Sequence, residues 1–338
     1  MKVLVTGGAG FIGSNYVRLI LRERPEDSVV NVDALTYAGN LENLADVLEH
    51  PRHVFARADV ASREAMEHLF DEHPDIEAVV HFAAETHVDR SLHVGVDAFI
   101  QTNILGTQVL LDACRARRHI RLVHVSTDEV YGSLGPEGRF TEQTPLAPNN
   151  PYAATKAGAD FLVHAAAHSH GLDALITRCS NNFGPYQFPE KLIPLMIANA
   201  LENKPLPVYG DGMQVRDWIY VEDHCRGIDT VLRAGRTGRV YNIGSMHDMP
   251  NLELVRKLLA LLDRPETLIR HVTDRPGHDR RYAMDASRIQ HELGWSPRYG
   301  FDEALQKTID WYLSHGEWLE RVRSGEYTDY YENMYARR

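Results

Sequence analysis

Short apolar runs alternate with amphipathic segments through the first half of the chain. The runs lie at residues 2–6, 29–33, 53–58, 76–82, 120–126 and 174–178. The segments between them space apolar residues at helical intervals, at residues 11–24, 62–70 (with Ser62 as a candidate N-cap), 97–117 and 152–169. Strands that alternate with helices in this way form a parallel sheet with helices on both faces. The pattern therefore predicts an α/β fold built on a doubly wound parallel sheet.

The alternation becomes irregular after residue 184, where residues 184–190 are loop-like. Beyond this loop we expect helices at about 190–202, 251–263, 286–293 and 301–315, and short strands near Val208, 239–243 and 268–272. This indicates a larger domain over residues 1–184 and a smaller α/β domain over residues 185–338. The boundary is not a single cut, because segments near 218–244 are expected to return to the larger domain.

Composition and charge narrow the possible partners. The chain has 43% apolar and 25% charged residues, as a globular protein does, and its net charge of −11 argues against nucleic acid or an anionic membrane. No apolar run approaches the roughly 18 residues that span a bilayer, and the first residues resemble a strand rather than a secretory leader. Three scattered cysteines, Cys114, Cys179 and Cys225, lack metal-ligand spacing. We therefore expect a cytoplasmic protein with reduced thiols and no metal site.

A glycine-rich turn joins the first predicted strand to the first predicted helix. Its spaced glycines are Gly7, Gly10 and Gly13. Glycines at this spacing permit a tight turn, close approach of a pyrophosphate, and close packing of the helix on the strand. The helix N-terminus then faces the phosphates. Glycine-rich turns are common, but this one lies in the context that a dinucleotide site requires.

An acidic residue ends the second predicted strand. Asp33 is placed to accept hydrogen bonds from the adenosine ribose hydroxyls and to repel a 2′-phosphate. No arginine follows it in Ala34-Leu35-Thr36, so the pattern favours NAD over NADP. Asp59 ends the third strand, where it either contacts the adenine or is a turn residue.

Candidate catalytic side chains follow the fifth predicted strand. Thr127, Asp128 and Glu129 stand where that strand ends, which is where such sheets bind ligands. Tyr152 and Lys156 lie four residues apart, on one face of the next helix. Together these residues supply a hydroxyl, an acid, a base, and a phenol beside a cation. An isolated Asp-Glu pair is usually a solvated loop, but the buried strand and the glycine turn favour catalysis here.

With these motifs the chain resembles the extended short-chain dehydrogenases/reductases, and within them the nucleotide-sugar 4,6-dehydratases. The resemblance spans essentially the whole chain and is carried by residues 6–13, 33–40, 81–91, 126–132, 152–156, 178–186, 189–194 and 274–282. The Thr127-Asp128-Glu129 triplet discriminates, because sugar epimerases of this fold typically carry small or neutral residues in the last two places. The resemblance implies a Rossmann-type NAD-binding domain over residues 1–184 and a mainly substrate-binding domain over residues 185–338.

The reaction that the resemblance implies is an intramolecular redox dehydration, with dTDP-glucose as the favoured substrate. Tyr152, as a phenolate favoured by Lys156 and the nicotinamide, removes the 4-hydroxyl proton while carbon 4 gives hydride to NAD⁺; Thr127 positions the 4-oxygen. Glu129 then removes the proton on carbon 5, and neutral Asp128 protonates the departing 6-hydroxyl. Hydride returns to carbon 6, which gives a 4-keto-6-deoxy sugar nucleotide. Two adjacent buried carboxyl groups can divide into an acid and a base in this way.

The resemblance also implies the binding residues. For NAD, beyond those already given, they are Phe11, Ile12, Ala34, Leu35, Thr36, Asp59, Val60, Phe82, Ala83, Ala84, Thr102 and Asn182. For the substrate, beyond Thr127, they are Thr86, His87, Asn181, Glu190, Lys191, Leu192, Pro207, Val208, Tyr209, Arg216, Asn251, Arg275, His278 and Tyr282. Residues 207–209 are expected to hold the base, and the arginines the diphosphate. The helices at 97–117 and 152–170 are expected to form a four-helix bundle in a homodimer.

Three alternatives stay open. The same chemistry on UDP-glucose or another nucleotide hexose is barely separated by the sequence. A 4-epimerase or decarboxylase of the same fold is disfavoured by Asp128 and Glu129, because a 4-epimerase needs no elimination. The third alternative is a nucleotide-binding protein that has lost catalysis. It predicts substitution of Tyr152, Lys156 or Thr127, and all three are present.

Overall fold

The computed structural model describes residues 1–93, 95–274 and 278–323. Within them, seven parallel strands form the large sheet: β1 (Lys2–Thr6), β2 (Ser28–Asp33), β3 (His53–Arg57), β4 (Ile76–His81), β5 (Arg121–Thr127), β6 (Ala174–Cys179) and β10 (Val240–Ile243). Their order is β10-β6-β5-β4-β1-β2-β3. The direction of winding reverses between β1 and β4, and ligands bind outside the carboxyl ends of strands at such a point.

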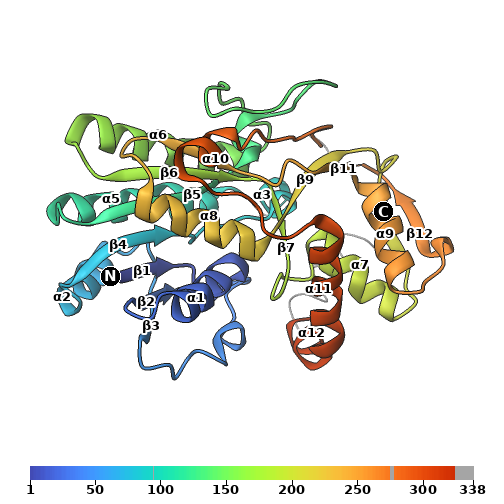
Figure 1. Ribbon diagram of the computed structural model, residues 1–338, viewed down its shortest axis with the longest axis horizontal. Helices are drawn as coiled ribbons and strands as arrows, with labels where there is room; N and C mark the ends of the chain where they lie inside the picture. Colours follow the sequence, from blue (N-terminus) through green and yellow to red (C-terminus); the bar gives the residue numbers. More distant parts are fainter. Residues whose placement is uncertain (94, 275–277, 324–338) are drawn as a thin grey trace.

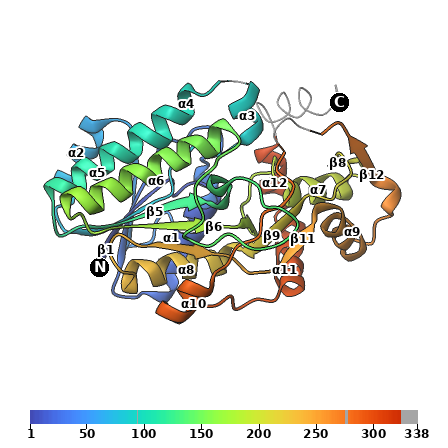
Figure 2. The same ribbon diagram turned by 90° about the horizontal axis from the view of Figure 1, so that it is seen from above.

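Helices cover both faces of the large sheet (Figure 2). On one face lie α2 (Arg63–Glu72), α5 (Thr107–Ala116) and α6 (Pro151–His170), and on the other α1 (Phe11–Glu23), α8 (Val221–Ala234) and α10 (Ser287–Leu293). A separate apolar core fills each interface, one around Tyr16 and Ile228 and one around Phe70 and Leu110. The strands are continuous apolar runs because both of their faces are covered.

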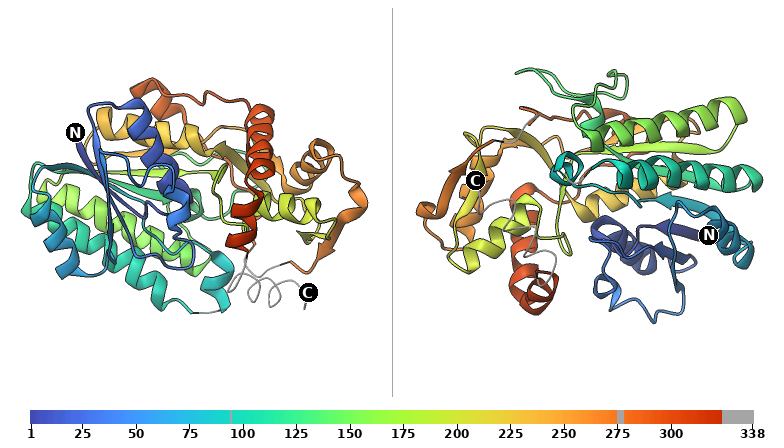
Figure 3. Two further views of the ribbon diagram at one scale, coloured as in Figure 1. Left: turned by 90° about the horizontal axis from the view of Figure 1, so that it is seen from below. Right: turned by 180° about the vertical axis from the view of Figure 1, so that it is seen from behind.

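A smaller part of the molecule lies beyond the carboxyl ends of the large sheet (Figures 1 and 3). It contains α7 (Leu192–Leu201), α9 (Asn251–Leu261), α11 (Phe301–Ser314) and α12 (Gly316–Val322), with η4 (Glu266–Leu268) before its last strand. Two small sheets join them, one of β7 (Asn181–Phe183), β9 (Val215–Tyr220) and β11 (Asp248–Pro250), the other of β8 (Leu206–Tyr209) and β12 (Ile269–Val272). The core of this part is built around Phe183, Trp218 and Tyr312. Between its segments the chain returns to the large sheet through α8 and β10.

The fold class predicted from the apolar pattern is confirmed, and the predicted strands of the large sheet agree with the structure to within two residues. Ser62 is the N-cap of α2, where its hydroxyl accepts a hydrogen bond from the Ala65 N–H at 3.3 Å. Several elements were not predicted, namely η1 (Leu41–Leu44), α3 (Val88–His93), β7, β9, α8, β11, η4 and α12. Of these, η1, β7, β11 and η4 have only three or four residues, which is too short to show a hydrophobic period.

The predicted helix at 97–117 is not one α-helix. It is divided into α4 (Asp97–Phe99), a π-helical segment η2 (Ile100–Gly106) and α5. A π-helix bonds residue i to i+5, and seven residues are too few for the apolar pattern to separate that spacing from α-helical spacing. Within η2, the buried Asn103 amide donates to the Glu85 carbonyl and to the Thr155 hydroxyl, at 3.0 and 2.9 Å. The irregular segment thus lies against both the end of β4 and the helix α6.

Two observations bear on the environment of the protein. In the part of the chain that the structure describes, no helix has the length and apolar character needed to cross a membrane. The three cysteines, Cys114, Cys179 and Cys225, are buried and form no disulfide.

Candidate active site

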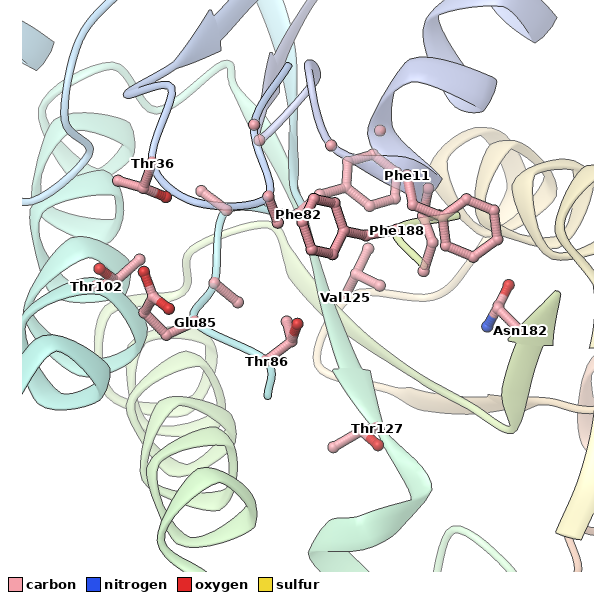
Figure 4. A pocket seen from close by; sticks show the side chains of 18 of the residues that line it. Phe11, Thr36, Phe82, Glu85, Thr86, Thr102, Val125, Thr127, Asn182 and Phe188 are labelled. Carbon is pink, nitrogen blue, oxygen red and sulfur yellow. The ribbon is translucent and has the colours of Figure 1, made fainter. Parts of the chain in front are cut away.

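A pocket opens at the carboxyl ends of the large sheet, between the sheet and the smaller part of the molecule. Figure 4 shows its lining, with Thr36, Glu85 and Thr102 toward one side, Asn182 toward the other, and Thr127 at the end of its strand. The lining comes from the β1–α1 turn, from the ends of β2, β4, β5 and β6, from α6, and from the loop before α7. The pocket therefore lies at the switch point that the strand order defines.

The glycine turn is shaped by two positions that admit no side chain. Gly7 has a positive φ of 70°, and a Cβ atom there would lie 2.6 Å from the Ala83 nitrogen. A Cβ atom on Gly13 would lie 2.3 Å from the Gly7 carbonyl oxygen. Gly10 is the N-cap of α1 and has no side chain to occupy the first N–H groups of that helix. These free N–H groups and the open cradle fit a pyrophosphate.

Asp33 lies beside this cradle, at the end of β2. Its carboxylate accepts hydrogen bonds from the backbone N–H groups of Ala9, at 2.9 Å, and Leu35, at 2.8 Å. Burial raises the pKa of Asp33, and these two hydrogen bonds oppose the rise. The carboxylate is thus held facing the pocket, with lone pairs left for ribose hydroxyls. The N–H donors of the glycine turn and the carboxylate acceptor of Asp33 together fit NAD.

Thr127, Asp128 and Glu129 occupy the end of β5 and the start of the 3-10 helix η3 (Asp128–Tyr131). The Thr127 hydroxyl accepts from the Glu129 N–H and donates to the Asp128 carboxyl, both at 3.3 Å. Asp128 is only 3% exposed, whereas Glu129 is partly exposed toward the pocket. Two neighbouring carboxyl groups therefore have different environments.

This difference sets the protonation of Asp128. Burial, and then the Glu129 charge, raise the pKa of Asp128 well above its usual range, while Arg216 opposes the rise. Asp128 consequently keeps its proton under conditions in which an exposed carboxyl group has lost it. The arrangement provides a buried acid, Asp128, beside a more exposed carboxyl group, Glu129.

Tyr152 and Lys156 are brought to the same pocket by α6. Both are buried, at 7% and 3% exposure, and both line the pocket. The Lys156 ammonium donates to the Val125 carbonyl at 2.8 Å and lies 3.4 Å from Nε2 of His124. Burial lowers the pKa of Lys156 to about 8, and Asp160 opposes this.

The phenol of Tyr152 departs from expectation. Burial, followed by the Glu129 charge, raises the pKa of Tyr152 well above its usual range, while a hydrogen bond with Thr127 lowers it. The sequence predicted an environment that favours the phenolate. The side chains of this chain do the reverse, because the groups that dominate are apolar or anionic and the Lys156 ammonium is engaged by a backbone carbonyl.

A second group of polar side chains lines the mouth of the pocket around Glu190. The Tyr37 hydroxyl donates to Glu190 at 3.4 Å, and Nε2 of His87 lies 3.5 Å from its other carboxyl oxygen. Burial raises the pKa of Glu190 to about 7, with Lys191 and Arg90 opposing. Glu190 is therefore a group that can donate or accept a hydrogen bond near neutral pH.

The structure brings most of the predicted site residues into one pocket. Those that line it are Gly7, Gly10, Phe11, Ile12, Gly13, Asp33, Ala34, Thr36, Asp59, Val60, Phe82, Ala83, Ala84, Thr86, Thr102, Thr127, Asp128, Glu129, Tyr152, Lys156, Asn181, Asn182, Glu190 and Lys191. Those outside its lining are Leu35, His87, Leu192, Pro207, Val208, Tyr209, Arg216, Asn251, His278 and Tyr282. Arg275 lies outside the described residues.

Several residues outside the lining are nevertheless tied to it. Leu35 meets Asp33 through its backbone N–H, and His87 contacts Glu190. The Arg216 guanidinium lies 4.3 Å from the centre of the Tyr282 ring. Arg216 opposes the rise in the pKa of Asp128, and the Glu129 charge raises the pKa of Tyr282.

The residues predicted to hold the nucleotide base form a separate group in the smaller part of the molecule. Tyr209 in β8 donates to Asp89 at 3.3 Å, and its ring lies 5.9 Å from that of His278. His278 contacts Asp274 at 2.6 Å. These contacts place the group beside, and not within, the lined pocket.

Sequence reasoning missed part of the lining. The missed residues are Val32, Tyr37, Ala38, Gly39, Ala58, Glu85, Val125, Ser126, Cys179, Ser180, Gln187 and Phe188. Val32, Ala58 and Ser126 directly precede predicted residues at strand ends, so strand ends were the available signal for these three. Gln187 and Phe188 lie in the loop before α7, and only folding brings them near the sheet.

A dinucleotide cradle at a switch point, faced by a Tyr and a Lys one helical turn apart, is the arrangement of the NAD-binding short-chain dehydrogenases/reductases. The family model described as GDP-mannose 4,6 dehydratase matches residues 4–308. The chain belongs to that family.

Similar proteins agree with this assignment. The dTDP-glucose 4,6-dehydratase of Xanthomonas campestris pv. campestris (strain B100) is 53% identical, with 96% of each chain covered. The dTDP-glucose 4,6-dehydratase 1 of Escherichia coli (strain K12) is 50% identical, with 100% of each covered. Among solved structures, the DesIV dTDP-glucose 4,6-dehydratase from Streptomyces venezuelae with NAD and TYD bound has a TM-score of 0.91 at 48% identity. The match covers 95% of this chain and 100% of the DesIV chain.

Proposed function

We propose that this protein converts dTDP-glucose to dTDP-4-keto-6-deoxyglucose, using NAD that is regenerated in each turnover. The observation that carries this proposal is the unequal carboxyl pair: Asp128 is buried with a raised pKa, and Glu129 beside it is partly exposed. A reaction that only oxidises carbon 4 has no use for an acid and a base side by side, whereas an elimination needs both. The choice of thymidine nucleotide rests on the relatives at 50% and 53% identity, which are dTDP-glucose 4,6-dehydratases.

The chain holds NAD with the glycine cradle, the α1 N-terminus and Asp33, which favours a free 2′-hydroxyl. When bound, NAD accepts hydride from carbon 4 and returns it to carbon 6, and its positive ring offsets the raised pKa of Tyr152. Because burial and the Glu129 charge disfavour the phenolate of Tyr152, a positive charge beside the phenol favours its formation. We therefore expect proton removal from the 4-hydroxyl to be faster in the NAD-loaded enzyme.

The remaining steps belong to side chains of β5 and η3. Thr127 hydrogen-bonds the 4-oxygen while Tyr152 takes its proton. The 4-ketone makes the hydrogen on carbon 5 acidic, and Glu129 removes it as a proton. Asp128 gives its own proton to the departing 6-hydroxyl, which leaves as water. Glu129 then returns its proton to carbon 5. The proton retained by Tyr152 balances the one lost by Asp128, so its transfer to Asp128 restores the starting state.

The nucleotide is proposed to lie toward the smaller part of the molecule. We assign NAD binding to residues 1–184 with the returning segments near 218–244, and nucleotide-sugar binding mainly to residues 185–338. Glu190 and Lys191, from the loop before α7, line the pocket and support this assignment. Tyr209 and His278 form the adjoining aromatic contact in which a base could stack.

A homodimer and a cytoplasmic location complete the proposal. Exposed apolar side chains on η2 and α6, namely Ile100, Leu105 and the 60% exposed Phe161, support a dimer through these helices. The buried free thiols fit a reducing compartment. Sedimentation of the purified protein tests the dimer, and a monomer at micromolar concentration contradicts it.

The test of the reaction is to incubate the purified protein with dTDP-glucose and, separately, with UDP-glucose. The strong near-ultraviolet absorbance that 4-keto-6-deoxy sugars develop in alkali reports product. We expect product from dTDP-glucose, little from UDP-glucose, and a large loss in Glu129→Gln. Product from UDP-glucose alone would reassign the substrate. No product from either, with NAD still bound, would remove the dehydratase proposal.

A further inference from the structure

Asn150 stands immediately before α6 and is absent from the lining of the pocket. Its side chain is 8% exposed. Its carbonyl oxygen Oδ1 accepts a hydrogen bond from the Ala153 N–H at 2.8 Å, which makes Asn150 the N-cap of the helix that carries Tyr152. This half of the amide accounts for an Asn at the position, since Asn is a favoured N-cap.

The other half of the amide is used differently. Nδ2 of Asn150 donates to Oε2 of Glu129 at 3.0 Å. A single planar amide thus joins the first turn of α6 to the carboxylate on η3. Because both ends of the amide are engaged, rotation of the side chain would break two hydrogen bonds at once.

The surroundings give this hydrogen bond electrostatic weight. The groups that face Glu129 are Asp128 from the same 3-10 helix, Tyr152 from α6 and Tyr282, and the Glu129 charge raises the pKa of each of them. The position of the Glu129 carboxyl group therefore matters for Asp128 and Tyr152 as well, and the Asn150 N–H holds that position.

We propose that Asn150 is a positioning residue for the base that removes the proton from carbon 5, holding the Glu129 carboxyl group in fixed register with Tyr152. This inference rests on the role given to Glu129 in the proposed function. The competing interpretation is that Asn150 only caps α6. The two interpretations differ in the effect they predict for a substitution that keeps the N-cap but removes the amide N–H donor.

Asn150→Asp is the discriminating variant, because aspartate has the same shape and caps helices as well as asparagine does. It replaces the N–H donor with an oxygen facing Glu129. Asn150→Ser is the companion variant: it keeps a good N-cap, removes the amide, and adds no charge. Ser62→Ala is the matched control, since it removes the N-cap of α2 and Ser62 itself is not one of the residues that line the pocket.

Three readouts are measured on the full-length protein with NAD and dTDP-glucose: kcat together with KM, the kinetic isotope effect of carbon-5 deuterium, and Tm. A base held out of register slows removal of the carbon-5 proton, so we expect kcat to fall about tenfold or more in Asn150→Asp with little change in KM. A smaller loss of kcat is expected in Asn150→Ser, with a larger carbon-5 isotope effect in both variants.

Stability separates the two readings. Both Asn150 variants should keep a Tm close to that of the unaltered protein, because the helix is still capped. Ser62→Ala should lower Tm and leave kcat and the isotope effect unchanged.

The inference is overturned if both Asn150 variants give the unaltered kcat and isotope effect while Glu129→Gln is strongly impaired. Asn150 is then a cap only. If Glu129→Gln itself retains full activity, the role of Glu129 in the proposed function fails, and the inference falls with it for a different and recognisable reason.

Discussion

The two ends of the pocket differ in which parts of the chain form them. The cofactor end, around Gly7, Gly13 and Asp33, is formed by backbone geometry, open space and one oriented carboxylate. The catalytic end, around Asp128, Glu129 and Tyr152, is formed by side chains whose protonation is set by burial and by one another. The comparison teaches that NAD binding depends on the open space and backbone geometry of the glycine turn. Catalysis depends instead on side chains whose ionised forms are disfavoured by burial and by neighbouring charge.

The electrostatic contrast follows from this. Asp33 is buried, yet two backbone N–H groups support its charge, as a group that accepts ribose hydroxyls requires. Asp128 has its hydroxyl neighbour Thr127 but also the charge of Glu129 beside it, and its proton is retained. Changes at the two ends should therefore fail in different measurements.

The largest effect is expected at the catalytic end from Tyr152→Phe. The variant keeps the ring in its buried place and removes the group that accepts the 4-hydroxyl proton, so kcat should fall on the order of 10³–10⁴-fold. NAD affinity, measured by calorimetry, should stay the same because the cofactor end is untouched. A loss of tenfold or less would show that another group takes this proton.

Asp128→Asn should lower kcat by about 10²–10³-fold, because the leaving hydroxyl loses its proton donor. The unaltered enzyme should also lose activity as pH rises through the raised pKa of Asp128, since only the protonated form is an acid. The residual activity of the variant should lack that alkaline limb. Rates across pH 5 to 10 test this, and an unchanged alkaline limb in Asp128→Asn would assign the limb to another group.

Gly7→Ala is the corresponding break at the cofactor end. The added Cβ atom meets the Ala83 nitrogen at 2.6 Å, and the positive φ of 70° is strained for alanine. NAD affinity should weaken by about 10- to 100-fold, since strain and contact together cost a few kcal/mol.

Gly171→Ala is the matched control for that break, because its φ is 63° and no atom lies within 4 Å of the added Cβ. It should lower Tm through the left-handed conformation alone and leave NAD affinity unchanged. Equal loss of affinity in both variants would show that conformation, and not the cradle, is responsible.

The smallest effect is on stability. The folded-state pKa of Asp128 is raised, so its protonated form contributes stability that is complete below the unfolded pKa of about 4 and is lost as pH rises through the folded pKa. Asp128→Asn has no such loss. The Tm of Asp128→Asn should therefore rise relative to that of the unaltered protein as pH increases from about 4 through the folded-state pKa of Asp128. Parallel Tm curves across pH would contradict the raised pKa.

Much of the fold and of the site was predictable because it is local. The apolar runs predicted the strands of the large sheet, and the side chains at strand ends, such as Asp33 and Thr127, line the pocket as expected. The prediction was weakest for residues 207–209 and 251, which do not line the pocket. These positions come from a part of the chain in which short elements leave no period and pairing is between distant segments, as in β8 with β12.

By itself, the sequence determined the alternation of strands and helices, the glycine cradle, and the identity of the acid, base and phenol, since each is written in neighbouring residues. The tertiary structure alone decided their charges and their coupling. The raised pKa of Tyr152, the retained proton of Asp128 and the hydrogen bond from Asn150 to Glu129 depend on burial and on contacts between separate elements. The physical reason is that a residue type sets an ordinary pKa, whereas desolvation and nearby charge, which move it, exist only once the chain has folded.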